Sequence, residues 1–211
     1  MTKQKQRRNK AMKKGLLFVI SGPSGTGKGT VVKHLLKTGK FFFSVSATTR
    51  APRDEDVNGV TYHFISREEF CKKIESGEML EHAEFSGNLY GTPKFAVETA
   101  LNEGKNVILE IETKGALQIR EKMPDAVLIF ILPPDMETLR SRLIGRGSET
   151  PESVELRLSQ VKREVSLLSH YDYAVVNEDG KSEEAAEEIL RIAHTENLRA
   201  SRNLEFQKKF I

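Results

Sequence analysis

A glycine-rich loop between an apolar run and a helical pattern constrains this chain more than any other feature. The loop follows the apolar run 16–20 and precedes the amphipathic stretch 31–36. Strand, glycine loop and helix in this order are typical of a loop whose backbone amides and helix N-terminus bind phosphate groups. The sequence therefore predicts a site for nucleotide phosphates, formed by Gly22, Pro23, Ser24, Gly25, Thr26, Gly27, Lys28, Gly29 and Thr30.

Two residues of this loop carry further chemistry. Lys28 supplies a mobile positive charge for the β- and γ-phosphates. The next position is usually Ser or Thr, whose hydroxyl holds magnesium, but here it is Gly29 and the hydroxyl follows at Thr30. The magnesium ligand is thus left open, with Thr30 as one candidate. The alternative of a glycine-rich turn with a chance lysine is disfavoured by the flanking strand and helix.

Composition excludes several classes of protein. The 211 residues suit one compact domain, and no apolar run approaches the roughly 20 residues of a membrane-spanning helix. The first fourteen residues are too polar for a secretory signal, and the single cysteine, Cys71, forms no internal disulfide. We therefore expect a globular cytoplasmic protein, with Cys71 packed on a helix.

The basic charge of the chain is concentrated in its N-terminal tail. Residues 1–14 hold seven of the 33 Lys and Arg residues and no acid, which leaves 26 basic against 30 acidic residues elsewhere. The body therefore has a formal charge of about −4, and the tail has no aromatic side chain to stack on bases. We expect a disordered basic tail over residues 1–14 and no nucleic-acid or membrane partner.

Five β-rich runs alternate with helical patterns along the chain. Their near-continuous apolar character is typical of a parallel sheet covered by helices on both faces, and they span 16–21, 41–46, 106–111, 126–132 and 173–176. Helix starts are expected at Ser66 with Glu69, at Thr150 with Pro151, and at Ser182. This order predicts a doubly wound α/β fold, in which ligands bind at the carboxyl ends of the strands.

Two polar segments interrupt this alternation, at 47–92 and at 140–157. Both are longer than ordinary connections, so we expect functional lobes on a rigid core. In the first segment Arg50 and Arg53 can fork onto a second phosphate group, and Tyr62 and Tyr90 can donate hydroxyls to it. The alternative for each arginine alone is a solvated surface charge, but the whole set after a phosphate loop favours a second phosphate site.

The first segment also contains Glu81 and Thr92. A carboxylate can accept hydrogen bonds from an N1–H and an exocyclic amine on one edge of a base. Guanine presents that pair and adenine does not, and a buried carboxylate left unpaired by the wrong base is costly. Glu81 and Thr92 therefore predict a guanine site.

Glu110 lies near the end of the apolar run 106–111, and Glu112 follows it directly. Alternation along a strand puts both carboxylates on one side, where one can face magnesium and the other the phosphate acceptor. The alternative is that a strand-end acid caps the following turn.

The second segment carries arginines around two glycines. Phosphoryl transfer needs alignment and cations around the moving group, and a glycine-hinged segment can swing Arg142 and Arg146 over the phosphates. Arg157 follows on the next helix. For Arg140 we expect surface salt bridges instead.

The ordered set of motifs resembles the guanylate kinase family. The resemblance runs from about Leu16 to about Ile192 and rests on residues 21–28, 44–53, 57–62, 84–91 and 142–149. It implies the P-loop nucleoside monophosphate kinase fold, with a parallel five-stranded sheet, a GMP-binding lobe and a lid. The implied core is 15–46, 93–139 and 158–211, the GMP-binding lobe is 47–92, and the lid is 140–157, all within one domain over 15–211.

The resemblance also implies roles for individual residues. Lys28, Arg142, Arg146 and Arg157 match catalytic cations, and Asn177 matches a position beside the adenine of ATP. GMP is expected to contact Ser46, Arg50, Arg53, Asp56, Tyr62, Glu81, Tyr90, Thr92, Glu110 and Glu112. Mg²⁺ is the implied cofactor, with ATP as co-substrate and Thr30 and Glu110 as candidate ligands. Asp56 stands where the family usually has Glu, Glu112 where Asp is usual, and residues 113–115 depart from the usual glutamine–glycine pair.

The expected activity is reversible transfer of the γ-phosphoryl group of ATP to GMP, giving ADP and GDP. One alternative is a non-catalytic guanylate-kinase-like interaction module, which the intact phosphate loop and arginines disfavour. Another keeps the enzyme class with a different nucleotide or sugar phosphate as acceptor, which Glu81 and Thr92 disfavour. The sequence leaves the oligomeric state open between monomer and homodimer.

Overall fold

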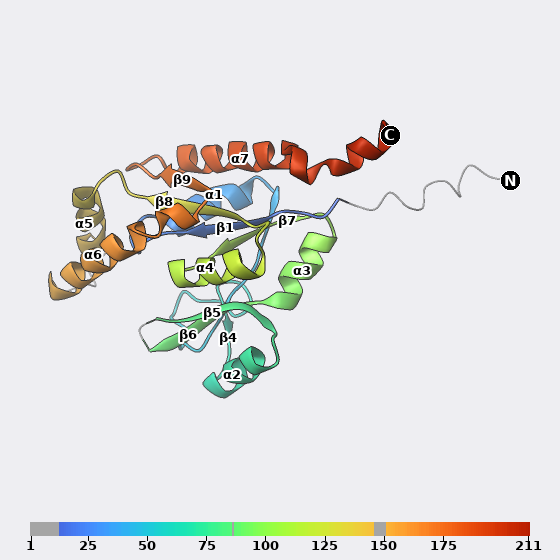
Figure 1. Cartoon of the computed structure of the whole chain (residues 1–211). Coiled ribbons are helices and arrows are strands. Elements are labelled where there is room, and N and C mark those ends of the chain that lie inside the picture. Colours follow the sequence, from blue (N-terminus) through green and yellow to red (C-terminus); the bar gives the residue numbers. More distant parts are fainter. Residues whose placement is uncertain (1–12, 86, 146–150) are drawn as a thin grey trace.

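The chain forms a helix-covered sheet with a smaller lobe attached to one side (Figure 1). The computed structural model describes residues 13–85, 87–145 and 151–211. The predicted helix start at Thr150 and the lid arginine Arg146 lie outside the described residues. None of the described helices has the length and apolar character needed to cross a membrane.

The core sheet has five parallel strands, as the sequence predicts. In spatial order they are β2 (Phe41–Phe43), β7 (Asn106–Glu110), β1 (Leu17–Ser21), β8 (Val127–Leu132) and β9 (Tyr173–Val176). Every residue of β1 is buried, which fits its central place in the sheet. The glycine loop follows β1, so it begins at the carboxyl end of the central strand, with β7 and β8 on either side.

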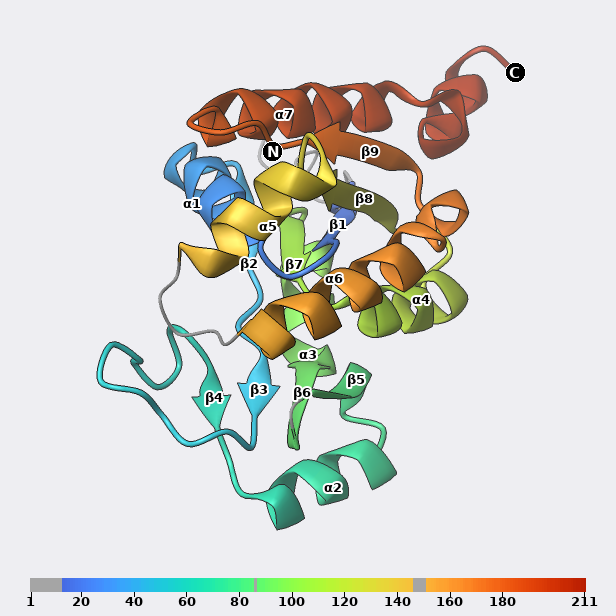
Figure 2. The same ribbon diagram turned by 90° about the vertical axis from the view of Figure 1, so that its left-hand side faces the viewer.

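Helices cover both faces of this sheet (Figures 1 and 2). The helices α1 (Lys28–Lys37) and α7 (Ser182–Leu198) pack on one face, and α3 (Lys94–Asn102) and α4 (Thr113–Lys122) on the other. Side chains of β1 alternate between the two cores: Phe18 and Ile20 join the first, Leu17 and Val19 the second. Two further helices, α5 (Met136–Ile144) and α6 (Pro151–Val165), pack on each other through a core of their own.

The lobe contains a second sheet that the sequence did not predict. Its strands, in spatial order, are β4 (His63–Phe64), β3 (Ala47–Thr48), β6 (Asn88–Pro93) and β5 (Met79–Phe85), and the helix α2 (Arg67–Glu75) packs beside them. The predicted helix start is confirmed, because Ser66 accepts a 3.1 Å hydrogen bond from the amide of Glu69.

Two sequence predictions need correction. The strand expected over 41–46 ends at Phe43, because the amide of Ser44 makes a last bond to Ile108 and the chain then crosses into the lobe as β3. Cys71 lies on α2 but is exposed, since the side of that helix that packs on the lobe core carries Phe70 and Ile74.

The first described residue, Lys13, contacts the segment that follows α7. Lys13 donates a 2.8 Å hydrogen bond to the side chain of Asn203, which lies between the 3₁₀ helices η3 (Ala200–Arg202) and η4 (Leu204–Lys209). The buried carboxylate of Glu196 accepts hydrogen bonds from Tyr173 and Arg202, so it ties this segment to the core sheet. A third 3₁₀ helix, η2 (Leu168–His170), precedes β9.

Candidate active site

The glycine loop joins β1 to α1 with a backbone that only glycine adopts readily. Gly22, Gly25 and Gly27 have φ angles of 138°, 87° and 84°. A Cβ added at Gly22 would lie 2.4 Å from the carbonyl oxygen of Ile131, so the neighbouring strand also excludes a side chain there. The loop amides and the N-terminus of α1 are thus available to an anion at the carboxyl edge of the sheet.

Lys28 occupies the hollow of this loop. Its ammonium donates hydrogen bonds of 2.6 Å to the carbonyl of Gly22 and 3.1 Å to that of Pro23, and the residue is 9% exposed. The charge is therefore held against the loop itself, where the phosphates of a bound nucleotide would lie.

The carboxylate of Glu110 lies beside the first turn of α1. β1 and β7 pair in register at Ile20 and Glu110, and a Cβ added at Gly29 would lie 3.5 Å from Glu110 Oε1. Thr30, one residue further, is exposed. Burial raises the pKa of Glu110, the Lys28 ammonium opposes the rise, and the charge of Glu112 adds to it.

Glu112 lies just beyond the strand, at the N-cap position of α4. Its side chain makes no capping hydrogen bond, so the alternative of a structural turn cap does not account for it. Across the gap to the lobe, burial raises the pKa of Tyr62, and the charges of Glu110 and Glu112 add to this rise. Glu110 and Glu112 of the core are therefore close enough to Tyr62 of the lobe for their charges to affect its pKa.

Glu81 and Thr92 meet inside the lobe, on the paired strands β5 and β6. The Thr92 hydroxyl donates a 2.7 Å hydrogen bond to Glu81 Oε1, and Glu81 is 3% exposed. Burial raises the pKa of Glu81 to about 7, while the Thr92 bond and the charge of Lys122 favour the ionised form. This is the carboxylate and hydroxyl pair that the sequence predicted for guanine.

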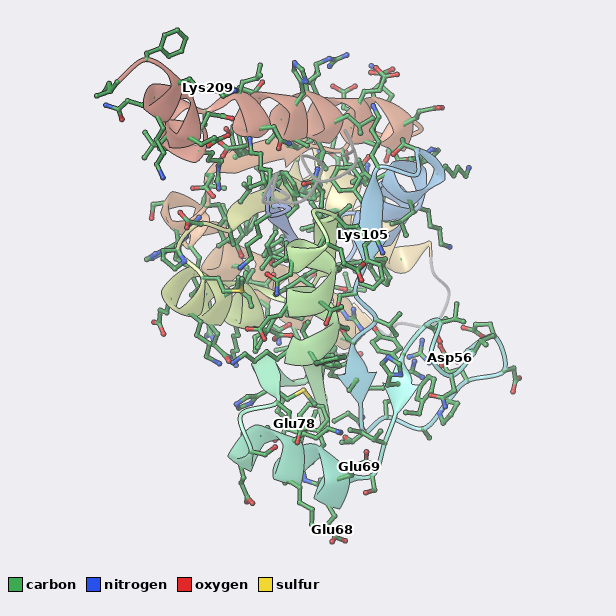
Figure 3. All side chains as sticks on the ribbon, turned by 90° about the vertical axis from the view of Figure 1, so that its right-hand side faces the viewer. Asp56, Glu68, Glu69, Glu78, Lys105 and Lys209 are labelled. Atoms are coloured by element: carbon green, nitrogen blue, oxygen red, sulfur yellow. The ribbon has the colours of Figure 1, made fainter. Side chains whose placement is uncertain are left out.

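Arg50 is held in place by the carboxylate of Asp56 and by the aromatic rings of Tyr62 and Phe64. It donates a 2.8 Å hydrogen bond to Asp56 and lies 5.6 Å from the centre of the Tyr62 ring, which itself packs edge-on against Tyr90 at 5.8 Å. The backbone amide of Arg53 and the guanidinium of Arg50 lower the pKa of Asp56. Figure 3 shows Asp56 in the outer loop of the lobe.

The other predicted lobe residues border this group. The side chain of Arg53 is exposed, although its amide holds Asp56. Ser46 lies between β2 and β3, and its carbonyl accepts a 2.8 Å hydrogen bond from the amide of His63.

Two of the predicted lid arginines contact the glycine loop, Arg142 from α5 and Arg157 from α6. Arg142 donates to Asp179 and to the carbonyl of Asn177, each at 2.8 Å, and reaches the carbonyl of Thr26 at 3.5 Å. Arg157 donates a 2.8 Å hydrogen bond to the hydroxyl of Ser24. The predicted lid range therefore spans the end of α5 and the start of α6. Arg140 pairs with Glu155, as expected for a surface salt bridge.

Asn177 follows β9 and buttresses the loop. Its amide nitrogen donates a 2.8 Å hydrogen bond to the carbonyl of Thr26. A Cβ added at Gly27 would lie only 2.4 Å from the same nitrogen, so this contact requires glycine there. The amide oxygen of Asn177 is buried and has no hydrogen-bond partner among the described residues. A buried acceptor of this kind suits a ligand donor such as an exocyclic amine.

Sequence reasoning missed a second group of polar residues behind the loop. Burial raises the pKa of Glu164, the charge of Glu112 adds to the rise and Lys28 opposes it. Tyr171 donates a 3.1 Å hydrogen bond to Ser21. The signal that was available for Glu164 is its spacing of seven residues from Arg157 on one helix, which puts both on one face.

The described residues contain no group of three or more His, Cys, Asp or Glu side chains arranged to hold a metal ion. Mg²⁺ is usually held by one or two carboxylates together with substrate phosphates and water. A single carboxylate beside the phosphate loop, such as Glu110, fits that mode of binding.

Comparisons with known proteins agree with this geometry. The guanylate kinase family model matches residues 14–195. A guanylate kinase of Clostridium perfringens (strain SM101 / Type A) is 54% identical over 90% of this chain and 87% of its own length, and one of Lactococcus lactis subsp. lactis is 50% identical over 91% and 93%. The crystal structure of guanylate kinase from Anaplasma phagocytophilum superposes with a TM-score of 0.75 at 37% identity, covering 90% of each chain.

The family match covers the glycine loop, the lobe with Glu81 and the helices that carry Arg142 and Arg157. The chain belongs to the guanylate kinase family.

Proposed function

We propose that this protein transfers the γ-phosphoryl group of ATP to GMP, reversibly, giving ADP and GDP. It is an ATP:GMP phosphotransferase by family. The single observation that carries the choice of acceptor is the buried Glu81 carboxylate, paired with Thr92 in a lobe beside the phosphate loop.

The donor site would be the glycine loop. Loop amides and the N-terminus of α1 bind the phosphates of ATP, and the Lys28 ammonium exchanges its loop carbonyls for β- and γ-phosphate oxygens. The unpaired oxygen of Asn177 accepts from the exocyclic amine of adenine. This assignment is supported by the contact between Asn177 and the loop at Thr26.

The acceptor site would lie in the lobe. Arg50 and Arg53 bind the GMP phosphate, and the hydroxyls of Tyr62 and Tyr90 donate to it, with Ser46 at its border. Ionised Glu81 accepts from N1–H and the exocyclic amine of guanine. Adenine offers an acceptor at N1, which would leave the buried carboxylate unpaired, and that cost provides the selectivity.

The magnesium ion that accompanies ATP would be held by Glu110, with the Thr30 hydroxyl as a second candidate. When bound, the ion neutralises phosphate charge between donor and acceptor. Glu112, at the start of α4, would face the GMP phosphate.

Transfer itself requires alignment rather than a covalent intermediate. An oxygen of the GMP phosphate attacks the γ-phosphorus in line, and ADP leaves. Arg142 and Arg157, which already touch the loop, stabilise charge on the moving group, and Arg146 is assigned the same role by its place in the predicted lid. Binding of both substrates would draw the lobe and lid together, so product release can limit turnover.

The test is nucleoside-diphosphate formation from ATP and Mg²⁺ with GMP, AMP, CMP and UMP in parallel, with Lys28→Ala as the control. We expect turnover with GMP alone and a loss of about 10²-fold or more in the control. Turnover with another acceptor would overturn the role of Glu81. GMP binding without turnover would favour the non-catalytic interaction module.

The proposed partners are the small molecules ATP and GMP, with no nucleic acid. A cytoplasmic location is part of the same proposal, since a free exposed thiol such as Cys71 suits a reducing compartment.

A further inference from the structure

The strand that carries Glu81 is at the edge of its sheet. β5 pairs with β6 on one side, and the other side faces α4 of the core. The pairing of β5 is also irregular between Met79 and Glu81, where the register shifts. An edge strand with such a bulge needs other partners for its backbone polar groups if it is to hold one position.

Side chains of α4 supply these partners on both sides of Glu81. Gln118 accepts a 3.2 Å hydrogen bond from the amide of His82 and donates one of 2.6 Å to its carbonyl, as a neighbouring strand would. Lys122 donates a 2.6 Å hydrogen bond to the carbonyl of Leu80. The residues before and after Glu81 are therefore both tied to α4.

The backbone of α4 closes on the carboxylate itself. A Cβ added at Gly115 would lie 2.2 Å from Glu81 Oε2 and 3.0 Å from Cδ. Gly115, Gln118 and Lys122 are spaced three and four residues apart, so one face of the helix makes all of these contacts. One oxygen of Glu81 is oriented by Thr92, and the other is confined by Gly115.

We propose that Gln118 and Gly115 are positioning residues for guanine selectivity, acting through Glu81. This proposal rests on the proposed function. Glu112, the residue proposed to face the acceptor phosphate, is at the N-cap position of α4, and the same helix holds the strand that carries Glu81. The helix α4 therefore sets the spacing between the two ends of GMP. In this proposal Gln118 and Gly115 act by orienting Glu81 and its strand.

A structural role alone would give a different result from positioning. Loss of a purely stabilising contact lowers the melting temperature and leaves the Michaelis constants unchanged. Loss of positioning raises KM for GMP and leaves KM for ATP unchanged, because the glycine loop is held by other residues. It also lowers the preference for GMP over IMP, which lacks the exocyclic amine.

The first experiment compares Gln118→Ala with Glu121→Ala, an exposed position on the same helix. We expect KM for GMP to rise about tenfold in Gln118→Ala, with KM for ATP unchanged and both constants unchanged in Glu121→Ala. Gln118→Glu, which can accept from His82 but not donate to it, should show a smaller rise. An unchanged KM for GMP in Gln118→Ala would overturn the proposal.

The second experiment is a double-mutant cycle with Glu81→Gln. If Gln118 acts through Glu81, the rise in KM for GMP caused by Gln118→Ala should largely disappear in the Glu81→Gln background. An equal rise in both backgrounds would show that Gln118 acts elsewhere. If Glu81→Gln by itself leaves GMP use and base preference unchanged, the guanine site assigned under the proposed function fails, which is a separate result.

Gly115→Ala provides a variant that leaves every hydrogen bond of Gln118 available. Alanine favours a helix, so α4 should remain intact, but its Cβ must displace the Glu81 carboxylate. We expect a raised KM for GMP and a reduced preference over IMP, without a fall in melting temperature. A normal KM for GMP in this variant would contradict the positioning role of Gly115.

Discussion

The hydroxyl of Thr92 donates a 2.7 Å hydrogen bond to the carboxylate of Glu81, and both residues are buried. A hydroxyl donor on one oxygen favours the ionised, acceptor-only form of the carboxylate. The Thr92 hydrogen bond thereby opposes the rise in the pKa of Glu81 that burial causes, and it favours a carboxylate that accepts hydrogen bonds from a ligand.

Replacement of Thr92 by Val should weaken GMP use, because it removes this donor with little change of shape. We expect KM for GMP to rise about tenfold and the free energy of unfolding to fall by about 1 kcal/mol. Steady-state kinetics and urea unfolding would measure both. Thr92→Ser keeps the donor and should resemble the parent protein; a Ser variant as weak as the Val variant would point to packing instead.

The stability of the nucleotide-free protein should depend on pH through Glu81. Its pKa is about 7 when folded and close to 4.5 when unfolded. Below pH 4.5 both states are protonated and no penalty arises. As pH rises toward 7 the unfolded state ionises first, so stability is lost, by on the order of 3 kcal/mol once the folded state has ionised as well.

Urea unfolding of the parent protein and Glu81→Gln between pH 4.5 and 8 would test this sign. The variant does not titrate at this position, so its stability relative to the parent should increase with pH and level off above about pH 7. Glu121→Gln, at an exposed site, should give no such trend. A difference between parent and Glu81→Gln that stays constant with pH would refute the raised pKa.

The ion pair between Arg50 and Asp56 should affect the binding of GMP, the phosphate acceptor, and not the binding of ATP, the donor. Asp56→Ala releases the guanidinium and the amide of Arg53, so we expect KM for GMP to rise by up to about fivefold, with KM for ATP unchanged. Asp54→Ala, exposed in the same loop, is the matched control. A larger effect on KM for ATP than on KM for GMP would exclude this assignment of the lobe.

Replacement of Asn177 should have the opposite pattern of effects, on the binding of ATP and not of GMP. Asn177→Ala removes the support of the Thr26 carbonyl and the proposed acceptor for adenine, so KM for ATP should rise about tenfold while KM for GMP stays the same. Asp179→Ala, at an exposed carboxylate that pairs with Arg142, separates the effect of Asn177 from that of the arginine. Equal changes in the two Michaelis constants would argue against an adenine contact.

Local sequence patterns were sufficient for the core. The apolar run before Gly22 and the glycines after it specify a strand and a turn with positive φ angles, which depend on few distant contacts. All five core strands were anticipated because a strand buried on both faces has a near-continuous apolar sequence. The helix start at Ser66 could also be predicted from local sequence, because the capping hydrogen bond joins residues only three positions apart.

The lobe depended on contacts between distant residues. The strand β3 has two residues and is defined by its partners Phe64 and Tyr90, so no periodic pattern marks it. The predicted strand over 41–46 ended early because the chain changes sheets after Ser44, and Cys71 is exposed because of the direction in which α2 packs.

The sequence by itself determined the family, the phosphate loop and the residue types of the site, because these lie in short contiguous motifs. Only the tertiary structure decided that Glu81 is buried, that Thr92 and Gly115 confine its two oxygens, and that Gln118 holds its strand. These residues are up to 37 positions apart in the chain. Their chemistry arises from burial and hydrogen bonds that exist only once the lobe has packed against α4.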